Sequence, residues 1–190
     1  THFNAKAMAL FPKKIADQYV AVLTPNTDLP PAVIAIAKFD ELADMWSAGF
    51  WEKWYQDLKQ HTIPIERIDT DQIEVGGVPI PTADGWLLPY AHIQNYPTED
   101  KRIFGIEAVL LDLNNPQEIV ARTKGPLITP EAKYERDGMV PNVIFPSSAL
   151  IDGDKLRLYY GAADTHCAAA EIVLPDLIAE MKANPFKATY

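Results

Sequence analysis

Three pairs of strand-like segments repeat along the chain and decide its fold. They are Asp17-Gln-Tyr-Val-Ala-Val-Leu23 with Ala32-Val-Ile-Ala-Ile-Ala-Lys-Phe-Asp40, Asp84-Gly-Trp-Leu-Leu-Pro-Tyr90 with Ile106-Glu-Ala-Val-Leu-Leu-Asp112, and Asp154-Lys-Leu-Arg-Leu-Tyr-Tyr160 with Cys167-Ala-Ala-Ala-Glu-Ile-Val-Leu174. The opening aspartates lie 67 and 70 positions apart. Fixed-period repetition of strand pairs is typical of a radial β-architecture such as a propeller. We therefore expect an all-β fold with a functional site on the shared axis.

Composition limits the class of protein. Of the 190 residues, 48% are hydrophobic and 23% are charged, which is ordinary for a globular domain. No Ser/Gly linker divides the chain, so we expect residues 1–190 to form a single domain. The formal net charge of −9 argues against nucleic-acid partners and anionic membranes, because both need clustered Lys and Arg.

The compartment is predicted from what the chain lacks. No run of 18 apolar residues could cross a membrane, and no basic-then-apolar signal segment opens the chain. Cys167 is the single cysteine, which excludes an intrachain disulfide and fits a cytoplasmic, bacterial-type location. We expect its thiol to be buried, because Cys167 begins an apolar run. The chain begins at Thr1 without an initiator Met, and we expect it to be a piece of a longer polypeptide.

One long segment has a helical rather than a strand-like pattern. Between Asp40 and Leu58, apolar residues recur every three or four positions, which predicts an amphipathic helical insert. Its aromatic residues, Trp46, Trp51 and Trp54 among them, either fasten the insert to the sheets or stack on a sugar face. A second, short helix is predicted from Asp176 to Ala183.

Two carboxylates are candidate site residues. Glu135 lies in a loop before Val140-Pro-Asn-Val-Ile-Phe-Pro146, and Asp164 follows the aromatic strand of the last repeat among small residues that admit a ligand. Paired carboxylates suggest glycoside chemistry. The alternatives are an exposed loop charge for Glu135 and a turn-capping carboxylate for Asp164. No pair among His2, His61, His92 and His166 has the spacing of metal ligands.

Several motifs together resemble glycoside hydrolase family 130. They are Ala9-Leu-Phe-Pro-Lys-Lys-Ile15, Pro79-Ile-Pro-Thr-Ala-Asp-Gly-Trp-Leu-Leu88, Val109-Leu-Leu-Asp-Leu113, Asn115-Pro116, Pro126-Leu127, Tyr134-Glu135, Gly138, Pro141-Asn-Val-Ile-Phe-Pro146 and Tyr159-Tyr-Gly-Ala-Ala-Asp-Thr165. The resemblance implies a five-bladed β-propeller that acts on β-mannosides by inverting phosphorolysis or hydrolysis. It implies no cofactor, with inorganic phosphate as co-substrate in a phosphorylase and an oligosaccharide as substrate.

The resemblance covers only the later part of that fold. By the repeat count this chain supplies about three blades with a helical insert, and the upstream blades are absent from it. The family's proton donor, an Asp in a Glu-Asp-Pro-Arg segment, belongs to the earlier part, and this sequence has no such segment. We therefore expect the chain to pair with the missing N-terminal blades or to self-associate, because the open faces of a partial propeller expose apolar surface.

The resemblance also suggests roles for individual residues. Lys6 is similar to a phosphate-contacting lysine, Asp164 to a mannose-binding aspartate, and Glu135 to a glutamate implicated in the hydrolases. Glu135 is the predicted catalytic residue. Tyr134 and Asn142 lie in matching motifs and are predicted to bind substrate with Asp164 and Lys6.

One position departs from the phosphorylase pattern. Where phosphorylases have Tyr-His, with the histidine contacting phosphate, this chain has Tyr90-Ala91. His92 is predicted to bind substrate in place of that histidine only if a β-bulge turns it inward, because adjacent strand residues face opposite sides. We therefore expect hydrolysis of β-linked mannosides. The alternatives are an inverting β-mannoside phosphorylase and a non-catalytic carbohydrate-binding propeller fragment.

Overall fold

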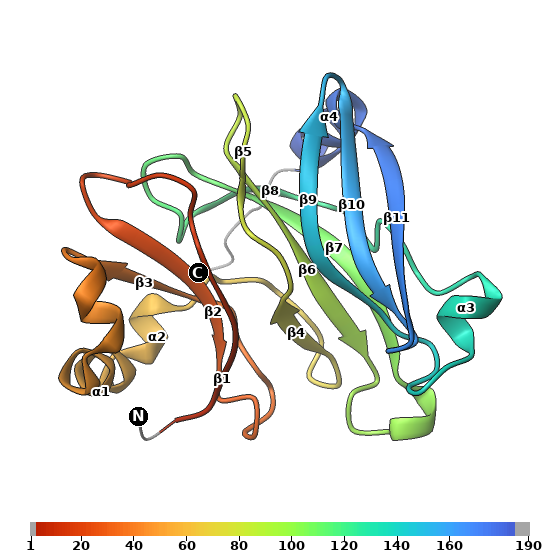
Figure 1. Cartoon of the computed structure of the whole chain (residues 1–190), viewed down its shortest axis with the longest axis horizontal. Helices are drawn as coiled ribbons and strands as arrows, with labels where there is room; N and C mark the ends of the chain where they lie inside the picture. The colour runs from red at the N-terminus through yellow and green to blue at the C-terminus, as the bar shows by residue number, and fades with distance from the viewer. Residues whose placement is uncertain (1–2, 185–190) are drawn as a thin grey trace.

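The computed structural model describes residues 3–184, which form three antiparallel sheets and a few short helices (Figure 1). The first sheet contains β1 (Ala5–Leu10), β2 (Tyr19–Pro25) and β3 (Ala35–Phe39), in that order. The middle sheet contains β4 (Gln72–Val75), β6 (Trp86–Gln94), β7 (Ile103–Leu111) and β8 (Ile119–Arg122), with β5 (Ile80–Pro81) paired to β6. The third contains β9 (Ile144–Asp152), β10 (Lys155–Ala162) and β11 (His166–Val173), with β10 central. The prediction of mostly β-structure is confirmed.

Each sequence repeat forms two neighbouring strands of one sheet. The three pairs are β2–β3, β6–β7 and β10–β11, and all are antiparallel. An earlier strand, β1, β4 or β9, adds to the first strand of each pair and forms one edge of its sheet. Each sequence repeat therefore corresponds to one sheet of the structure.

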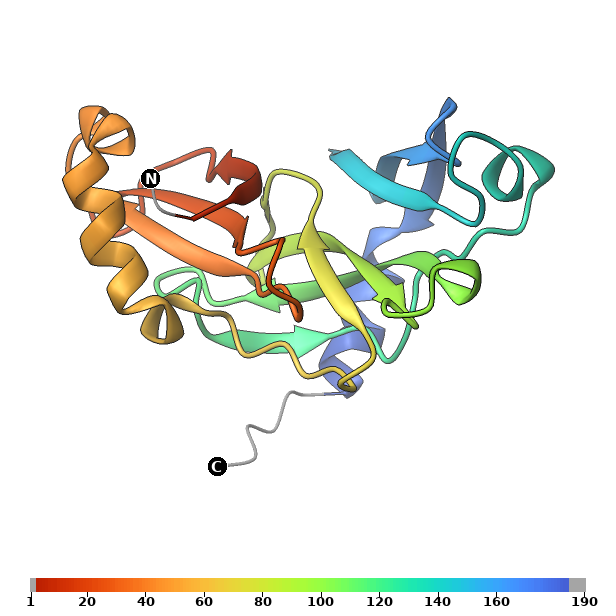
Figure 2. The same ribbon diagram turned by 90° about the horizontal axis from the view of Figure 1, so that it is seen from below.

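The middle sheet buries both of its faces, because alternate residues of a strand point to opposite sides. Trp86 and Leu88 belong to the cluster that includes Val22 of the first sheet. Leu87, one position away, packs with Leu156 of the third sheet and with α4 (Leu174–Ala183). Figure 2 shows the three sheets following one another across the molecule, with the middle sheet between the other two.

The predicted helical insert is confirmed. It consists of η1 (Leu42–Trp46), α1 (Ala48–Gln56) and α2 (Leu58–His61). Trp51 and Trp54 are buried against the first sheet, and Trp54 Nε1 donates a hydrogen bond to the Ile36 carbonyl at 3.0 Å. These two indoles fasten the insert, as the packing interpretation predicted, whereas Trp46 is 85% exposed.

Two local features of the third sheet are informative. Strand β9 includes Pro146, which is tolerated there because β9 is an edge strand. Cys167 is exposed, so the prediction of a buried thiol was wrong. Its register partner is Gly161, and the face of β11 on which it lies has no covering element among residues 3–184.

The remaining helices are short. They are η2 (Glu99–Lys101), between β6 and β7, and α3 (Lys133–Arg136), before β9. The terminal helix, α4, begins two residues before the predicted Asp176, with a proline in its first turn, where the missing N–H costs no helical hydrogen bond. No helix within residues 3–184 has the length and apolarity needed to span a bilayer.

Candidate functional site

Four of the predicted site residues lie near one another at one end of the third sheet. Tyr134 and Glu135 are on α3, Asn142 is in the loop before β9, and Asp164 is in the turn between β10 and β11. Figure 1 shows α3 beside the lower ends of β10 and β11. The sequence motifs that carry these residues therefore converge.

Glu135 is buried at 4% exposure, so the alternative of an exposed loop charge is wrong. Its Oε2 accepts hydrogen bonds from the backbone N–H groups of Glu131 and Ala132, at 2.7 and 2.8 Å. Its Oε1 accepts a hydrogen bond from the Tyr160 hydroxyl at 2.7 Å. These three donors fix the carboxylate at the start of α3.

The same hydrogen bonds keep Glu135 ionised. Burial alone would raise the pKa of Glu135, but the Tyr160 hydroxyl and the backbone N–H groups stabilise the charged form, so its pKa lies below the usual glutamate range. Burial and the neighbouring carboxylate raise the pKa of Tyr160. Glu135 is therefore an ionised hydrogen-bond acceptor at neutral pH, and it is a poor proton donor. It lines a cleft of about 460 Å³ together with residues 126–129, 131 and 132.

The backbone around Asp164 is strained. Asn142, Ala163 and Asp164 have φ values of 59°, 47° and 50°, in the left-handed region that residues other than glycine seldom adopt. The Ala163 N–H donates to the Val143 carbonyl at 2.8 Å, which joins this turn to the loop. Such residues occur in tight hairpin turns, and they also cluster at ligand sites where surrounding hydrogen bonds hold them in place.

Gly138 shows how closely the two segments approach. A Cβ atom at this position would lie 2.4 Å from the Ala163 carbonyl oxygen, so only glycine fits. Tyr134 is 43% exposed, and its ring meets that of His166 edge to face at 6.2 Å between centroids. The Asp164 carboxylate is exposed and has no hydrogen-bond or ion-pair partner among residues 3–184. Its side chain therefore does not act as a cap within this part of the chain.

His92 lies in a separate, partly buried network on the middle sheet. Its Nδ1 is 2.7 Å from Glu107 Oε1, and its Nε2 is 2.8 Å from Asp71 Oδ2. Glu107 also accepts a hydrogen bond from the Tyr90 hydroxyl at 2.6 Å. The β6–β7 pairing is continuous, with no bulge at His92, so its side chain faces away from that of Ala91. Direct contact between His92 and substrate stays a prediction.

The charges in this network are mutually stabilised. The hydrogen bond to Glu107 raises the pKa of His92 despite partial burial, and Asp71 adds to the effect. Burial would raise the pKa of Glu107, but the hydrogen bonds from His92 and Tyr90 lower it overall. An imidazolium that donates to two carboxylates satisfies both of its N–H groups. Because Asp71 immediately precedes β4, the network links the start of β4 to β6 and β7.

Lys6 belongs to a third group, at the edge strands of the first two sheets. Its Nζ lies 3.9 Å from Glu74 Oε2, with 61% of the lysine side chain exposed against 9% for Glu74. Glu74 Oε1 accepts from Gln72 Nε2 at 2.9 Å, and the side-chain amide oxygen of Gln72, Oε1, has no hydrogen-bond partner among residues 3–184. Ala91 is the register partner of Glu74 and adds no polar group.

Tyr134, Glu135, Asn142 and Asp164 thus lie on neighbouring segments at one end of the third sheet, whereas the polar contacts of Lys6 and His92 involve the first two sheets. The prediction missed several polar partners, namely Asp71, Gln72, Glu74, Glu107 and Tyr160. A signal for two of them is present in the sequence, since Glu74 and Glu107 are charges inside apolar strands and such charges need partners. No group of three or more His, Cys, Asp and Glu side chains within residues 3–184 is arranged to hold a metal ion.

Known proteins resemble this chain in both sequence and structure. A 1,2-β-oligomannan phosphorylase from a Thermoanaerobacter species is 34% identical over 90% of this chain and 52% of its own length. A β-1,2-mannobiose phosphorylase from Listeria innocua is 32% identical over 93% of this chain and 46% of its own. A solved structure of the Listeria innocua β-1,2-mannobiose phosphorylase, in complex with β-1,2-mannobiose, has a TM-score of 0.76 and 28% identity, and the match covers 95% of this chain and 48% of that one.

The chain therefore spans about half the length of the curated relatives it matches. A family model described as β-1,4-mannooligosaccharide phosphorylase matches residues 1–183, almost the whole sequence. The relatives named here are phosphorylases, so the comparisons do not support the preference for hydrolysis predicted from Ala91. With motifs, fold and relatives in agreement, this chain belongs to glycoside hydrolase family 130.

Proposed function

We propose that this chain forms part of the active site of a β-mannoside phosphorylase, which transfers a mannosyl group to inorganic phosphate. The observation that carries the proposal is the match over residues 1–183, with phosphorylases as the relatives above 30% identity. Because the chain spans about half of those relatives, the activity belongs to the complete protein.

The proposed architecture is three successive blades of a five-bladed β-propeller. In a propeller, blades pack face to face and their innermost strands surround the axis. Three antiparallel sheets with shared cores support this arrangement. Strands β1, β4 and β9 would then be the inner strands. Lys6 is on β1, and Asn142 lies two residues before the start of β9.

The site residues divide into sugar-binding and anion-binding groups. Asp164, Asn142 and Tyr134 would bind sugar hydroxyls, since they surround one strained turn. Glu135, held ionised by three donors, would accept a hydrogen bond from the sugar or its attacking partner. It cannot readily supply the proton for the leaving oxygen, so this proton must come from another part of the complete protein. Lys6 would contact phosphate.

Hydrolysis is a second candidate, which one observation favours. Phosphate needs several convergent cations to offset its desolvation, but the ion-pair partner of Lys6 is the carboxylate of Glu74 at 3.9 Å. Ala91, which pairs with Glu74 across the strands, adds no charge. Water as the attacking group needs no such cations.

A product assay distinguishes these reactions. The complete protein is incubated with β-1,2- and β-1,4-mannobiose, with and without phosphate. Phosphorolysis predicts mannose 1-phosphate, formed only when phosphate is present. Free mannose formed equally well without phosphate would instead support hydrolysis. Saturable binding without turnover would support the non-catalytic carbohydrate-binding alternative.

Matched variants connect the assay to the site. Asp164→Asn should lose most of the activity, because a charged hydrogen-bond acceptor for the sugar disappears. Asp176→Asn, the same chemical change at an exposed position of α4, should leave activity unchanged. Equal activity of the two variants would refute the assignment of Asp164.

One face of the third sheet is exposed and suggests that a partner covers it in the complete assembly. Leu150 is 57% exposed on this sheet, near the ion pairs of Glu171 with Lys155 and Arg157. We propose that the remaining blades of the complete protein, or a second copy of this chain, cover this face. If a second copy covers this face, size-exclusion chromatography of the isolated chain should show association. A monodisperse monomer at high concentration would exclude the second copy and leave the remaining blades as the occupant.

A further inference from the structure

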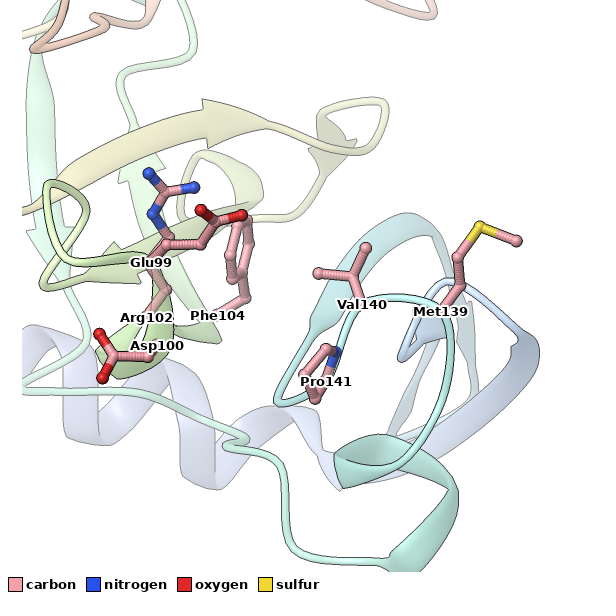
Figure 3. A pocket seen from close by; sticks show the side chains of 7 residues that line it. All are labelled: Glu99, Asp100, Arg102, Phe104, Met139, Val140 and Pro141. Atoms are coloured by element: carbon pink, nitrogen blue, oxygen red, sulfur yellow. The ribbon is translucent and has the colours of Figure 1, made fainter.

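A cleft beside the proposed site has no role in the arrangement described so far. It has a volume of about 550 Å³, within the range of roughly 300–1,000 Å³ that holds small ligands. Figure 3 shows Glu99, Arg102 and Phe104 on one side of it, and Val140 on the facing loop. The first wall belongs to the connection between β6 and β7 and to the start of β7, and the second to the loop between α3 and β9.

The lining combines apolar and polar groups. Phe104, Met139 and Val140 supply apolar surface, and Met139 is 81% exposed. Arg102 is the cation in the lining, and Glu99 lies on the same wall. With a second acidic side chain, Asp100, also in the lining, the local charge disfavours a phosphate or another anion. Apolar surface interleaved with hydrogen-bonding groups suits a neutral ligand that has both C–H faces and hydroxyls.

Arg102 is held in place as a donor. Its Nε donates to the Tyr96 carbonyl, and its guanidinium lies over the Tyr96 ring, 4.6 Å from the centroid. Its terminal nitrogens have no hydrogen-bond partner among residues 3–184. A guanidinium fixed by its own loop can donate to a ligand with little further loss of side-chain freedom.

Hydrogen bonds from backbone N–H groups connect the walls of the cleft to the turn that carries Asp164. The Val140 N–H donates to the Ala163 carbonyl at 3.2 Å, and the Met139 N–H donates to Thr165 Oγ1 at 3.0 Å. On the other wall, the Phe104 N–H donates to the Asn142 carbonyl at 3.1 Å. The same strained segment therefore connects the cleft with the proposed sugar-binding residues.

We propose that this cleft is a subsite for a neutral oligosaccharide, which binds the sugar units beyond those held at Asp164. The identity of the sugar as a β-mannoside rests on the proposed function. Arg102 donates hydrogen bonds to sugar hydroxyls, while Phe104 and Val140 contact the C–H faces. Longer chains would accordingly bind more tightly than disaccharides.

Methionine methyl NMR tests the subsite without relying on turnover. The chain has four methionines, Met8, Met45, Met139 and Met181, and only Met139 lines the cleft. Labelled with 13C-methyl methionine, the protein is titrated with β-1,2- or β-1,4-mannotetraose and with the matching mannobiose. The Met139 signal, assigned with Met139→Leu, should shift with the tetraose, while the buried Met181 signal should not.

A matched pair of variants measures the contribution of Arg102. Arg102→Met keeps the apolar stem and should weaken mannotetraose binding by roughly tenfold or more, the loss expected for a charged hydrogen bond. The Arg102→Met substitution should have little effect on the affinity for mannobiose. Arg122→Met, the same change on the edge strand β8, is the control and should bind like the wild type.

The outcomes separate this proposal from the proposed function. If the complete protein turns over mannosides but the Met139 methyl does not move at millimolar tetraose, the subsite is refuted and the function stands. If the Met139 methyl moves but no mannoside is turned over, the subsite stands and the phosphorylase proposal fails. Equal weakening of tetraose and disaccharide binding by Arg102→Met would also refute the subsite.

Discussion

Replacing His92 with glutamine should cost the protein several kcal/mol of stability at pH 6 and clearly less at pH 9. The ring donates to Asp71 and Glu107, and all three side chains are at most 15% exposed. Removing one partner of a buried ion pair costs about 3–5 kcal/mol, because the remaining charge is left uncompensated. Here two carboxylates would be left facing each other, so we expect about 3–5 kcal/mol at pH 6.

The pH dependence follows from the raised pKa of His92. Its contribution is fully present below the unfolded-state pKa of about 6.5. It is lost as the pH rises through the higher folded-state pKa, at about 1.4 kcal/mol per pH unit while only the folded state holds the proton. The lowered pKa of Glu107 acts in the opposite direction, and its contribution is lost as the pH falls through the folded-state pKa, below about 4.3. The network is therefore most stabilising between these limits.

Urea unfolding at pH 6 and pH 9, followed by circular dichroism, measures both effects. His166→Gln, at an exposed position, is the control and should change stability by less than about 0.5 kcal/mol. The triple variant Asp71→Asn, His92→Gln, Glu107→Gln should recover part of the loss, because no unpaired charge remains. A His92→Gln loss below about 1 kcal/mol at pH 6, or a larger loss at pH 9, would refute the reasoning.

Three further changes test other parts of the structure. Trp54→Ala should destabilise the protein by about 3–5 kcal/mol in the same unfolding assay, because its indole is buried, whereas Trp46→Ala should have little effect. Tyr160→Phe removes a donor to Glu135, so the pKa of Glu135 should rise in a 13C NMR titration, and its stabilising effect should be lost at a higher pH as the solution is acidified. Glu74→Gln should lower the KM for phosphate of the complete protein by up to about fivefold, since a partly exposed charge pair is worth at most about 1 kcal/mol; an unchanged KM would separate this carboxylate from phosphate binding.

Much of the fold was predictable because its signal is local. Alternating residues such as Trp86 and Leu87 face different neighbours, so both faces of the middle sheet had to be apolar. The strand pairs β2–β3, β6–β7 and β10–β11 follow directly from the repeats. The exposure of Cys167 was not predictable, because an apolar run does not reveal whether another sheet covers it.

The site was predicted less completely, because its partners are distant in the sequence. Tyr160 donates to Glu135 across 25 positions, and His92 reaches Asp71 across 21. Motifs identified Glu135 and Asp164 but gave no indication that Glu135 would be buried and ionised. The role expected of His92 required a bulge, and only the register of β6 with β7 shows that the strand is regular there.

The exposed Cys167 offers a practical handle on assembly. It is the single thiol in the chain and lies opposite Gly161 on the uncovered face of the β10–β11 hairpin. A maleimide dye would therefore attach at one position, with no competing thiol elsewhere in this sequence. Quenching of the dye's fluorescence as the protein concentration rises would report the association of identical copies. A shift of its emission wavelength on adding the remaining blades would report docking on that face.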